Sequence, residues 1–267
     1  NFNIVGEEWS DNPSLISYWQ KNKVNHDGYV SYLPTLMDFP LQISFVEALN
    51  DDFGWGKGFV KPYRTLANDF VYPNPNNLLI FPDNHDMARF YTQVNNDLDL
   101  FKMGIVYYST MRGIPQFYYG TEILMNSNEN PGDHGLIRTE FPGGWPDHLK
   151  NAFTGDGLSK DEKQTQLFFK ELLNWRKNNK VVHKGKLIQF SPKENGVYSF
   201  FRVFEGQLVW VIFNRNNSSR NIDTSRFKEL ISNKEFGYDV LNKKRVSIIN
   251  SIEIDKKSAL IIEFMAL

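Results

Sequence analysis

Short apolar runs alternate with amphipathic stretches along the first two thirds of the chain. The apolar runs have the length and composition of buried strands, and they are Phe2–Val5, Thr35–Phe39, Asn77–Phe81 and Ile114–Tyr119. Stretches with helical spacing follow them, at Asn12–Lys21, Leu41–Leu49, Asn96–Met111 and Lys163–Asn178. This repeated strand–helix order predicts parallel strands with helices packed against them.

Two further local features refine this pattern. Asn12 is the predicted N-cap of the first helix, because Pro13 follows it and suits the first helical position. Residues 51–63 and 124–157 are rich in Gly, Pro and aromatic residues and predict long irregular loops.

The pattern changes after Val182, where strand-like runs follow one another without a long helix between them. These runs are Val197–Val203, Leu208–Phe213, Val246–Ile249 and Leu260–Phe264. Turn-forming pairs such as Glu205-Gly206 separate them, which is typical of an antiparallel sheet. The sequence therefore predicts two domains, an α/β domain at 1–182 and an all-β domain at 183–267.

Composition narrows the classes of function. The net charge of -1 gives no overall field that would attract nucleic acid or an anionic membrane, and no apolar run reaches the roughly 20 residues of a membrane span. The chain has no cysteine, which excludes disulfides and thiolate metal sites. Aromatic residues make up 15% of the chain, and most of them, including the loop residues Trp55 and Trp145, are expected to pack rather than bind ligands.

Polar clusters lie at the ends of three of the predicted strands. Glu7, Glu8 and Trp9 end the first, Asn84, His85 and Asp86 end the third, and Tyr118–Glu122 ends the fourth. The carboxyl ends of parallel barrel strands form one rim, so these groups are expected to converge. Two carboxylates across a sugar are the minimal equipment for glycoside hydrolysis.

Each of these residues also has a structural interpretation. The structural alternatives to a role in catalysis or binding are a helix N-cap for Asp86, a hydrogen-bonded structural histidine for His85, and a surface carboxylate for Glu7.

Several motifs together resemble the α-amylase superfamily of glycoside hydrolases. Val5-Gly-Glu-Glu-Trp9 resembles the fifth-strand motif of that family, and Phe81–Asp86 the seventh-strand motif with its Asn-His-Asp ending. Gly113–Glu122 resembles the eighth strand, and Lys170–Lys180, with its Leu-x-x-Trp-Arg-Lys pattern, the eighth helix. The pattern Gly-Glu-x-Trp at Gly6–Trp9 is similar to the motif of the neopullulanase and cyclomaltodextrinase branch of the family.

The resemblance implies a fold and a partner. It places the chain as the second half of a (β/α)8 TIM barrel, strands five to eight, followed by an antiparallel β-sandwich. The first residue is Asn1, inside a strand pattern, so the chain is expected to be part of a longer protein. The missing N-terminal barrel half, or a second copy of the chain, is the expected partner, because half a barrel exposes strand edges and apolar helix faces.

The resemblance also implies roles for individual residues. Glu7 corresponds to the general acid/base, and Asp86 to the carboxylate that stabilises the transition state. The residues implied to bind the sugar are His85, Trp9, Asn84, Asp133 and Arg138. For Arg138, an ion pair with Asp133 or Glu140 is weighted equally with a contact to the sugar.

The implied activity is retaining hydrolysis of α-1,4 or α-1,6 glucosidic bonds in maltooligosaccharides, pullulan or cyclodextrins. The nucleophilic Asp of the family lies on the fourth strand, outside this chain, so the chain alone is expected to be inactive. A non-catalytic carbohydrate-binding protein or partner subunit is the alternative. No cofactor is expected and no metal-ligand spacing is present; the resemblance leaves room for calcium in the longer protein without identifying a ligand here. By resemblance, the protein is expected to be bacterial and periplasmic or extracellular.

Overall fold

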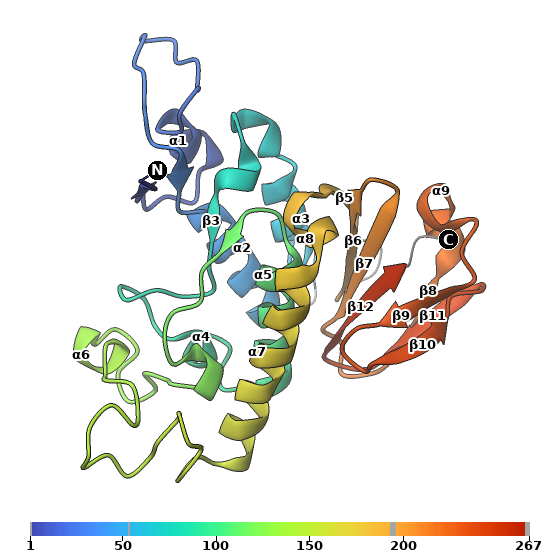
Figure 1. Ribbon diagram of the computed structural model, residues 1–267. Coiled ribbons are helices and arrows are strands. Elements are labelled where there is room, and N and C mark those ends of the chain that lie inside the picture. The colour runs from blue at the N-terminus through green and yellow to red at the C-terminus, as the bar shows by residue number, and fades with distance from the viewer. Residues whose placement is uncertain (1, 53, 193–195, 265–267) are drawn as a thin grey trace.

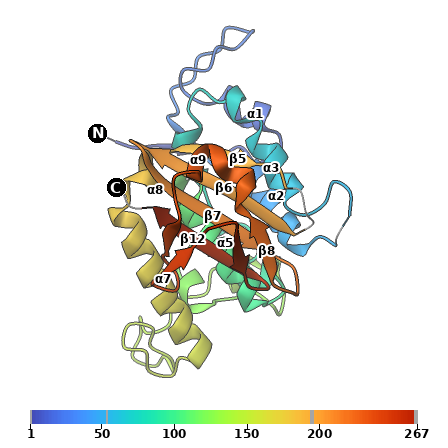
Figure 2. The ribbon, with the colours of Figure 1, turned by 90° about the vertical axis from the view of Figure 1, so that its right-hand side faces the viewer.

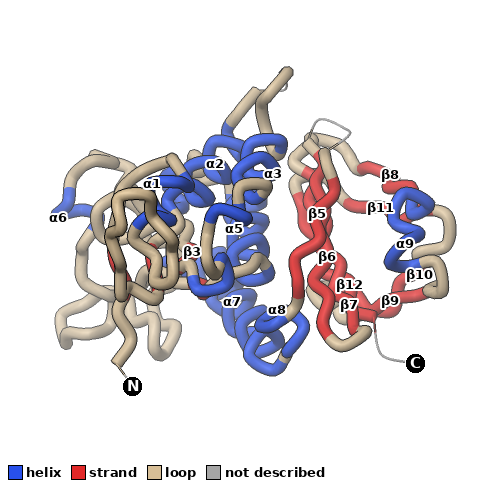
Figure 3. The backbone as a smooth tube through the Cα atoms, turned by 90° about the horizontal axis from the view of Figure 1, so that it is seen from above, coloured by secondary structure: helices blue, strands red, loops and turns tan. Residues whose placement is uncertain are grey.

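A layer of helices separates two sets of strands (Figure 1). The computed structural model describes residues 2–52, 54–192 and 196–264. Seen from above, the short strands and long loops of the N-terminal part lie on one side of the helices, and the C-terminal sheet lies on the other (Figure 3). The helices therefore contribute to the cores of both parts.

The short strands of the N-terminal part run parallel, in the order of the sequence. They are β1 (Val5–Gly6), β2 (Thr35–Leu36), β3 (Leu79–Ile80) and β4 (Ile114–Pro115). β1 pairs with β2 and β3 with β4, and a parallel bridge between Met37 and Leu79 joins the two pairs. The predicted parallel arrangement is confirmed. The strands are shorter than predicted, and Pro115 has no N–H to donate to a neighbouring strand.

The longer predicted helices are present, with boundaries set by their caps. The helices of this part are α1 (Pro13–Tyr18), α2 (Phe39–Asn50), α3 (Val60–Leu66), α4 (Phe90–Gln93), α5 (Leu98–Thr110), α6 (His134–Ile137), α7 (Lys160–Asn178) and α8 (Lys180–Lys184). The predicted N-cap Asn12 is confirmed, since its side chain accepts from the amide of Ser14. α7 begins three residues earlier than predicted because Ser159 and Glu162 form a capping box.

One expectation about the loops needs correction. Residues 51–63 are not all loop, because α3 begins at Val60 and continues to Leu66. No side chain caps the start of α3, so the sequence carries no start signal for it. The expected domain boundary at 182/183 falls inside the short helix α8.

The C-terminal part is built on one antiparallel sheet. Its strands, in spatial order, are β10 (Lys244–Ser247), β9 (Phe236–Asp239), β12 (Ser258–Phe264), β7 (Gln207–Asn214), β6 (Val197–Phe204) and β5 (Lys186–Phe190). A ribbon of β8 (Arg220–Asp223) and β11 (Ser251–Ile254), with the short helix α9 (Lys228–Ile231), lies against its outer face. The second layer of the expected sandwich is thus a two-stranded ribbon. Figure 2 shows the sheet with the helices behind it.

The inner face of the sheet packs on α2 and α5. The rings of Phe45 from α2 and Tyr107 from α5 stack with centroids 3.7 Å apart, and Phe213 from β7 contacts both. α5 is buried along most of its length, from Phe101 to Thr110. Stacked aromatic rings that bury this much apolar surface hold the two parts as one body.

Buried arginines bind the C-terminal carbonyls of these helices. Arg202 on β6 donates to the carbonyl oxygens of Thr110 (2.9 Å) and Gly185 (2.8 Å), and Arg176 on α7 donates to that of Ser109 (3.0 Å). Arg215, which follows β7, donates to the carbonyls of Ala48 and Asp51 at the end of α2. Burial, together with nearby arginines, lowers the pKa of Arg202 to about 9. Cations at helix C-termini satisfy carbonyls that have no partner in the helix.

We predict that Arg202→Ala lowers the free energy of unfolding by about 3 kcal/mol, because it leaves buried carbonyls without donors and opens a cavity. Urea unfolding followed by tryptophan fluorescence measures the change. Arg220→Ala is the control, since among the described residues the guanidinium of Arg220 binds only the neighbouring Ser218 and Ser219, and its loss should cost less than about 0.5 kcal/mol. Equal effects of the two substitutions would contradict the prediction.

Candidate active site

Glu7 and Trp9 project from the end of β1. The amide of Met37 donates to the carbonyl of Gly6 at 3.1 Å, which fixes the end of β1 beside the residues that follow β2. A Cβ on Gly6 would lie 2.8 Å from a methyl carbon of Leu33, so a larger residue before Glu7 would require the Leu33 side chain to shift. The side chain of Glu7 is exposed, and it makes no hydrogen bond or ion pair with any described residue.

An aromatic chain crosses the ends of three strands. The indole of Trp9 stacks on Phe39, the first residue of α2, at 4.5 Å between centroids, and Phe39 meets Phe81 edge-on at 5.1 Å. Phe39 and Phe81 are buried, whereas Trp9 remains 49% exposed. Trp9 therefore has one face supported by protein and the other free, which suits a platform for a sugar ring.

Asp86 is the centre of a charged cluster at the end of β3. Its carboxylate lies 2.5 Å from Arg138 Nη2, 3.1 Å from His85 Nε2 and 3.7 Å from His134 Nδ1. Arg138 also donates through Nε to the backbone carbonyl of His85 at 2.9 Å. The structure thus brings together Asp86, His85 and Arg138, and Arg138 pairs with neither of the carboxylates considered as alternatives, Asp133 and Glu140.

Asn84 and Asp133 shape the backbone around this cluster. Asn84 is buried, and its Oδ1 accepts from the amide of Asp86 at 2.8 Å. Asp133 is the N-cap of α6, where it accepts from the amides of Gly135 and Leu136. The exposed Asp133 therefore starts the helical turn whose far end places Arg138 next to Asp86.

Sequence reasoning missed a buried support beneath the cluster. Asp83 is fully buried, and its Oδ2 accepts from the amide of Phe90 at 2.7 Å, which closes the loop that displays residues 84–86. The guanidinium of Arg89 lies 4.1 Å from the ring centre of Tyr118 and donates to the carbonyl of Tyr119. The signal available in the sequence was Asp83, a carboxylate directly after the apolar residues of the strand-end motif Phe81–Asp86.

The buried position of Asp83 has an electrostatic consequence. Desolvation raises the pKa of Asp83 to about 7, although the Phe90 amide, the charge of Arg89 and the Thr121 hydroxyl favour the ionised form. The carboxyl of Asp83 therefore takes up a proton close to neutral pH.

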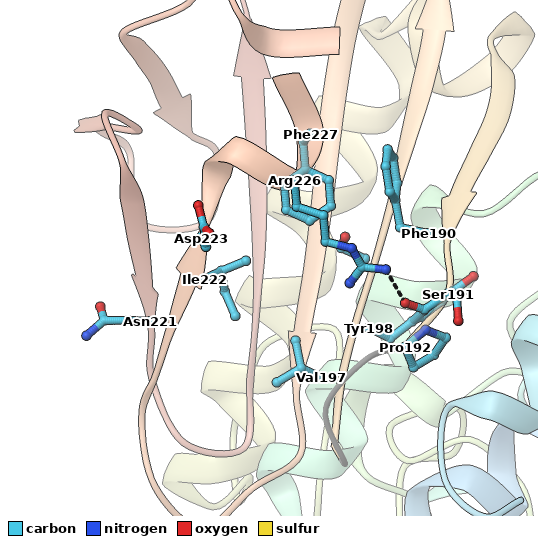
Figure 4. Close-up of a pocket in the computed structure, with 11 residues that line it drawn as sticks. Phe190, Ser191, Pro192, Val197, Tyr198, Asn221, Ile222, Asp223, Arg226 and Phe227 are labelled. Carbon is cyan, nitrogen blue, oxygen red and sulfur yellow. Dashed lines mark hydrogen bonds between the residues drawn. The ribbon is translucent and has the colours of Figure 1, made fainter. Parts of the chain in front are cut away.

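Two other features of the described chain concern metal binding and a cavity. Within residues 2–52, 54–192 and 196–264, no three His, Cys, Asp or Glu side chains are grouped so that they could hold a metal ion. A cavity of about 250 Å³ opens between β5, β6 and the turn after β8, lined by Arg226, Asn221 and Asp223 among others (Figure 4). It holds a single carboxylate and lies in the C-terminal part, away from the strand ends.

Comparison with known proteins places the chain in a family. Residues 1–174 match the model of the alpha amylase catalytic domain, and residues 187–263 match that of the cyclo-malto-dextrinase C-terminal domain. The catalytic-domain match covers most of the chain, so the chain belongs to the α-amylase family. The expected resemblance is confirmed.

Curated relatives support this assignment. The chain is 23% identical over 253 residues to alpha-amylase 3 of Dictyoglomus thermophilum, covering 88% of this chain and 46% of the relative. It is 24% identical to a cyclomaltodextrinase of Thermoanaerobacter pseudethanolicus, covering 91% of this chain and 36% of the relative. A cyclomaltodextrin glucanotransferase of Bacillus licheniformis is 30% identical over 158 residues, 58% of this chain and 19% of the relative. The chain thus spans less than half the length of these relatives.

Solved structures share the fold. The α-amylase of Geobacillus thermoleovorans, complexed with acarbose, matches with a TM-score of 0.74 and 19% identity, over 98% of this chain and 53% of that chain. An Anoxybacillus α-amylase matches with a TM-score of 0.74 and 21% identity, over 100% of this chain and 53% of that chain. Both parts of the chain therefore follow the α-amylase fold.

We predict that Asp83→Asn changes the pH dependence of stability. A folded-state pKa above the unfolded value means that the native state binds the extra proton, so this group's contribution to stability is present below about pH 4 and lost as pH rises to about 7. Asn keeps an acceptor for the Phe90 amide but does not ionise. Between pH 4 and pH 8, the free energy of unfolding of the variant should therefore rise relative to that of the wild type by roughly 4 kcal/mol.

Urea unfolding at a series of pH values measures this difference. Asp133→Asn is the matched control, because Asp133 is an exposed cap and Asn also caps helices. A gap between wild type and Asp83→Asn that stays constant with pH would overturn the assignment of the proton to Asp83.

Proposed function

We propose that the chain supplies the general acid/base and the transition-state carboxylate of a retaining α-glucan hydrolase. In this proposal β1 to β4 are strands five to eight of a (β/α)8 barrel at 1–182, and residues 183–267 form the C-terminal β domain. The observation that carries the proposal is the display of Glu7 and Asp86 at the ends of β1 and β3, on either side of β2. Trp9 and His85 lie beside them as sugar contacts.

Glu7 is assigned the proton transfers. An exposed carboxyl group at a strand end can reach the glycosidic oxygen of a bound glucan, protonate it as the bond breaks, and later remove a proton from the attacking water. The free face of Trp9 would hold the sugar on the leaving-group side by stacking.

Asp86 is assigned contacts with the sugar on the other side of the glycosidic bond. Arg138 and His85 hold its carboxylate in place, and they leave acceptor positions for sugar hydroxyl groups. His85 is itself exposed and can donate to the same sugar. Asn84 positions the amide of Asp86, and Asp133 places Arg138 through α6. These contacts orient the sugar before the bond is cleaved.

The proposed substrates are maltooligosaccharides, pullulan or cyclodextrins, and the bonds cleaved are α-1,4 or α-1,6 glucosidic bonds. The printed names of the relatives, amylases and cyclomaltodextrin enzymes, support this class. No observation favours the non-catalytic alternative.

The proposal also assigns the nucleophile to a segment outside the chain. Both outer strands of the parallel set carry half-exposed apolar residues, Ile4 and Val5 at β1 and Ile114 at β4. Exposed strand edges of this kind are normally covered by further strands. We therefore propose that the other half of the barrel pairs with β1 and β4 and brings the nucleophilic carboxylate.

We predict that Glu7→Gln lowers kcat of the complete natural polypeptide on maltooligosaccharides by about 10²- to 10⁴-fold, because Gln cannot transfer the proton. Release of reducing sugar measures the rate. Glu8→Gln, the neighbouring half-buried carboxylate, should retain activity within a few-fold of the wild type. Equal losses in the two variants, or full activity of Glu7→Gln, would refute the assignment of Glu7.

A second prediction concerns the isolated chain. The purified 267-residue chain should show no turnover of maltooligosaccharides above the Glu7→Gln background, because it lacks the attacking carboxylate. Turnover by this chain that disappears in its Glu7→Gln variant would contradict the proposed division of the active site.

A further inference from the structure

A second histidine, His134, lies next to the Asp86 cluster and is not among the residues proposed to contact the sugar. It is the first residue of α6, and its ring Nδ1 lies 2.8 Å from Nη2 of Arg138. The same ring atom lies 3.7 Å from Asp86 Oδ1, which is too long for a hydrogen bond. His134 is therefore connected to Asp86 through Arg138.

The chemistry of the two side chains fixes the direction of the hydrogen bond between them. The guanidinium of Arg138 has only N–H donors, so Nδ1 of His134 accepts from it and the proton of the neutral ring is on Nε2. Nη2 of Arg138 carries two hydrogens, and it lies 2.5 Å from Asp86 Oδ1 and 2.8 Å from His134 Nδ1. One nitrogen thus joins the carboxylate to the imidazole.

Arg138 depends on hydrogen bonds for its orientation. Its side chain is 45% exposed, so packing alone does not hold it in one geometry. Nε donates to the backbone carbonyl of His85 at 2.9 Å. In the part of the chain that the structure describes, the side chains that accept from Arg138 are those of Asp86 and His134. His134 is thus the acceptor that holds Nη2 from the side of α6.

The helical turn itself does not require the imidazole. Asp133 caps α6 by accepting from the amides of Gly135 and Leu136, and the amide of Arg138 closes the turn on the carbonyl of His134 at 3.1 Å. Ile137 is buried and anchors the turn to the protein. These contacts involve the backbone of His134 or other residues, so the hydrogen bond from Arg138 is the contact that its side chain adds.

We propose that His134 is a positioning residue for Asp86. By accepting from Arg138, it holds the guanidinium, and through it the carboxylate, in the orientation that the bound sugar requires. The proposal rests on the proposed function, in which Asp86 stabilises the transition state. A residue that orients such a group, without binding the substrate itself, affects kcat more than KM.

Two substitutions separate this role from a direct contact with the sugar. His134→Asn keeps an acceptor near the position of Nδ1 but has nothing in place of Nε2, whereas His134→Phe keeps a ring of similar shape without any acceptor. On maltoheptaose, the complete natural polypeptide with His134→Phe should lose about 3- to 10-fold in kcat with little change in KM, and His134→Asn should remain within about twofold of the wild type. His26→Ala, at another exposed histidine, is the control and should leave the rate unchanged.

A double-mutant cycle tests the route through Arg138. In an Arg138→Ala background, His134→Phe should cause no further loss of kcat, because the donor to the imidazole is already absent. The same loss with and without Arg138 would overturn the positioning role. So would His134→Asn as slow as His134→Phe, or a raised KM at unchanged kcat, since these results indicate a direct contact with the sugar.

The Glu7→Gln variant, assayed in parallel, separates this proposal from the proposed function. A wild-type polypeptide that cleaves no α-glucan, or a fully active Glu7→Gln variant, would refute the proposed function and with it the role of His134. An inactive Glu7→Gln variant together with His134→Phe as fast as the wild type would overturn the role of His134 alone.

Discussion

The docking of the six-stranded sheet on α2 and α5 is the interaction on which the rest of the structure depends. Stacked rings supply the apolar part of this contact, and Arg202 and Arg215 supply the polar part by binding the carbonyls at the ends of the two helices. A helix end buried without such donors would carry unsatisfied carbonyls. The position of α2 is therefore fixed at its C-terminus by the C-terminal sheet. Its N-terminus is Phe39, the residue that supports Trp9, so the sheet acts on the candidate active site through this helix.

A buried ion network fixes the other end of α2. Arg112, which lies just before β4, binds Asp38 at 2.6 Å and Asp69 through two hydrogen bonds. Burial acts against the charge of Arg112, but the two carboxylates outweigh it and raise its pKa. Asp38 also caps α2 through the amide of Leu41. The network joins the start of β4 to the end of β2. Removal of Arg112 or Asp38 would leave a buried charge without compensation. The network therefore enforces one arrangement of the end of β2 and the start of β4.

The sequence predicted the features that depend on local chemistry and missed those that depend on tertiary contacts. The strand ends with Glu7 and Asp86 were located because Gly, carboxylates and aromatic residues follow apolar runs. The helix α3 was missed, because it has no capping side chain. The pairing of Arg138 with Asp86 joins residues 52 positions apart and has no local signal. Trp55 illustrates the opposite limit, since composition favours packing of a tryptophan, whereas the structure leaves Trp55 97% exposed.

The two candidate carboxylates stand in different surroundings, and this difference bears on the proposed mechanism. Asp86 is held by Arg138 and His85, so its orientation is set before a ligand arrives. Glu7 has no such partner in the part of the chain that the structure describes, and Trp9 beside it has a free face. A group that must give up and regain a proton needs freedom to follow the glycosidic oxygen, whereas a group that stabilises charge works best when it is preorganised. In the proposed barrel, the segments that pair with β1 would complete the surroundings of Glu7, while those of Asp86 are already formed by residues 81–138.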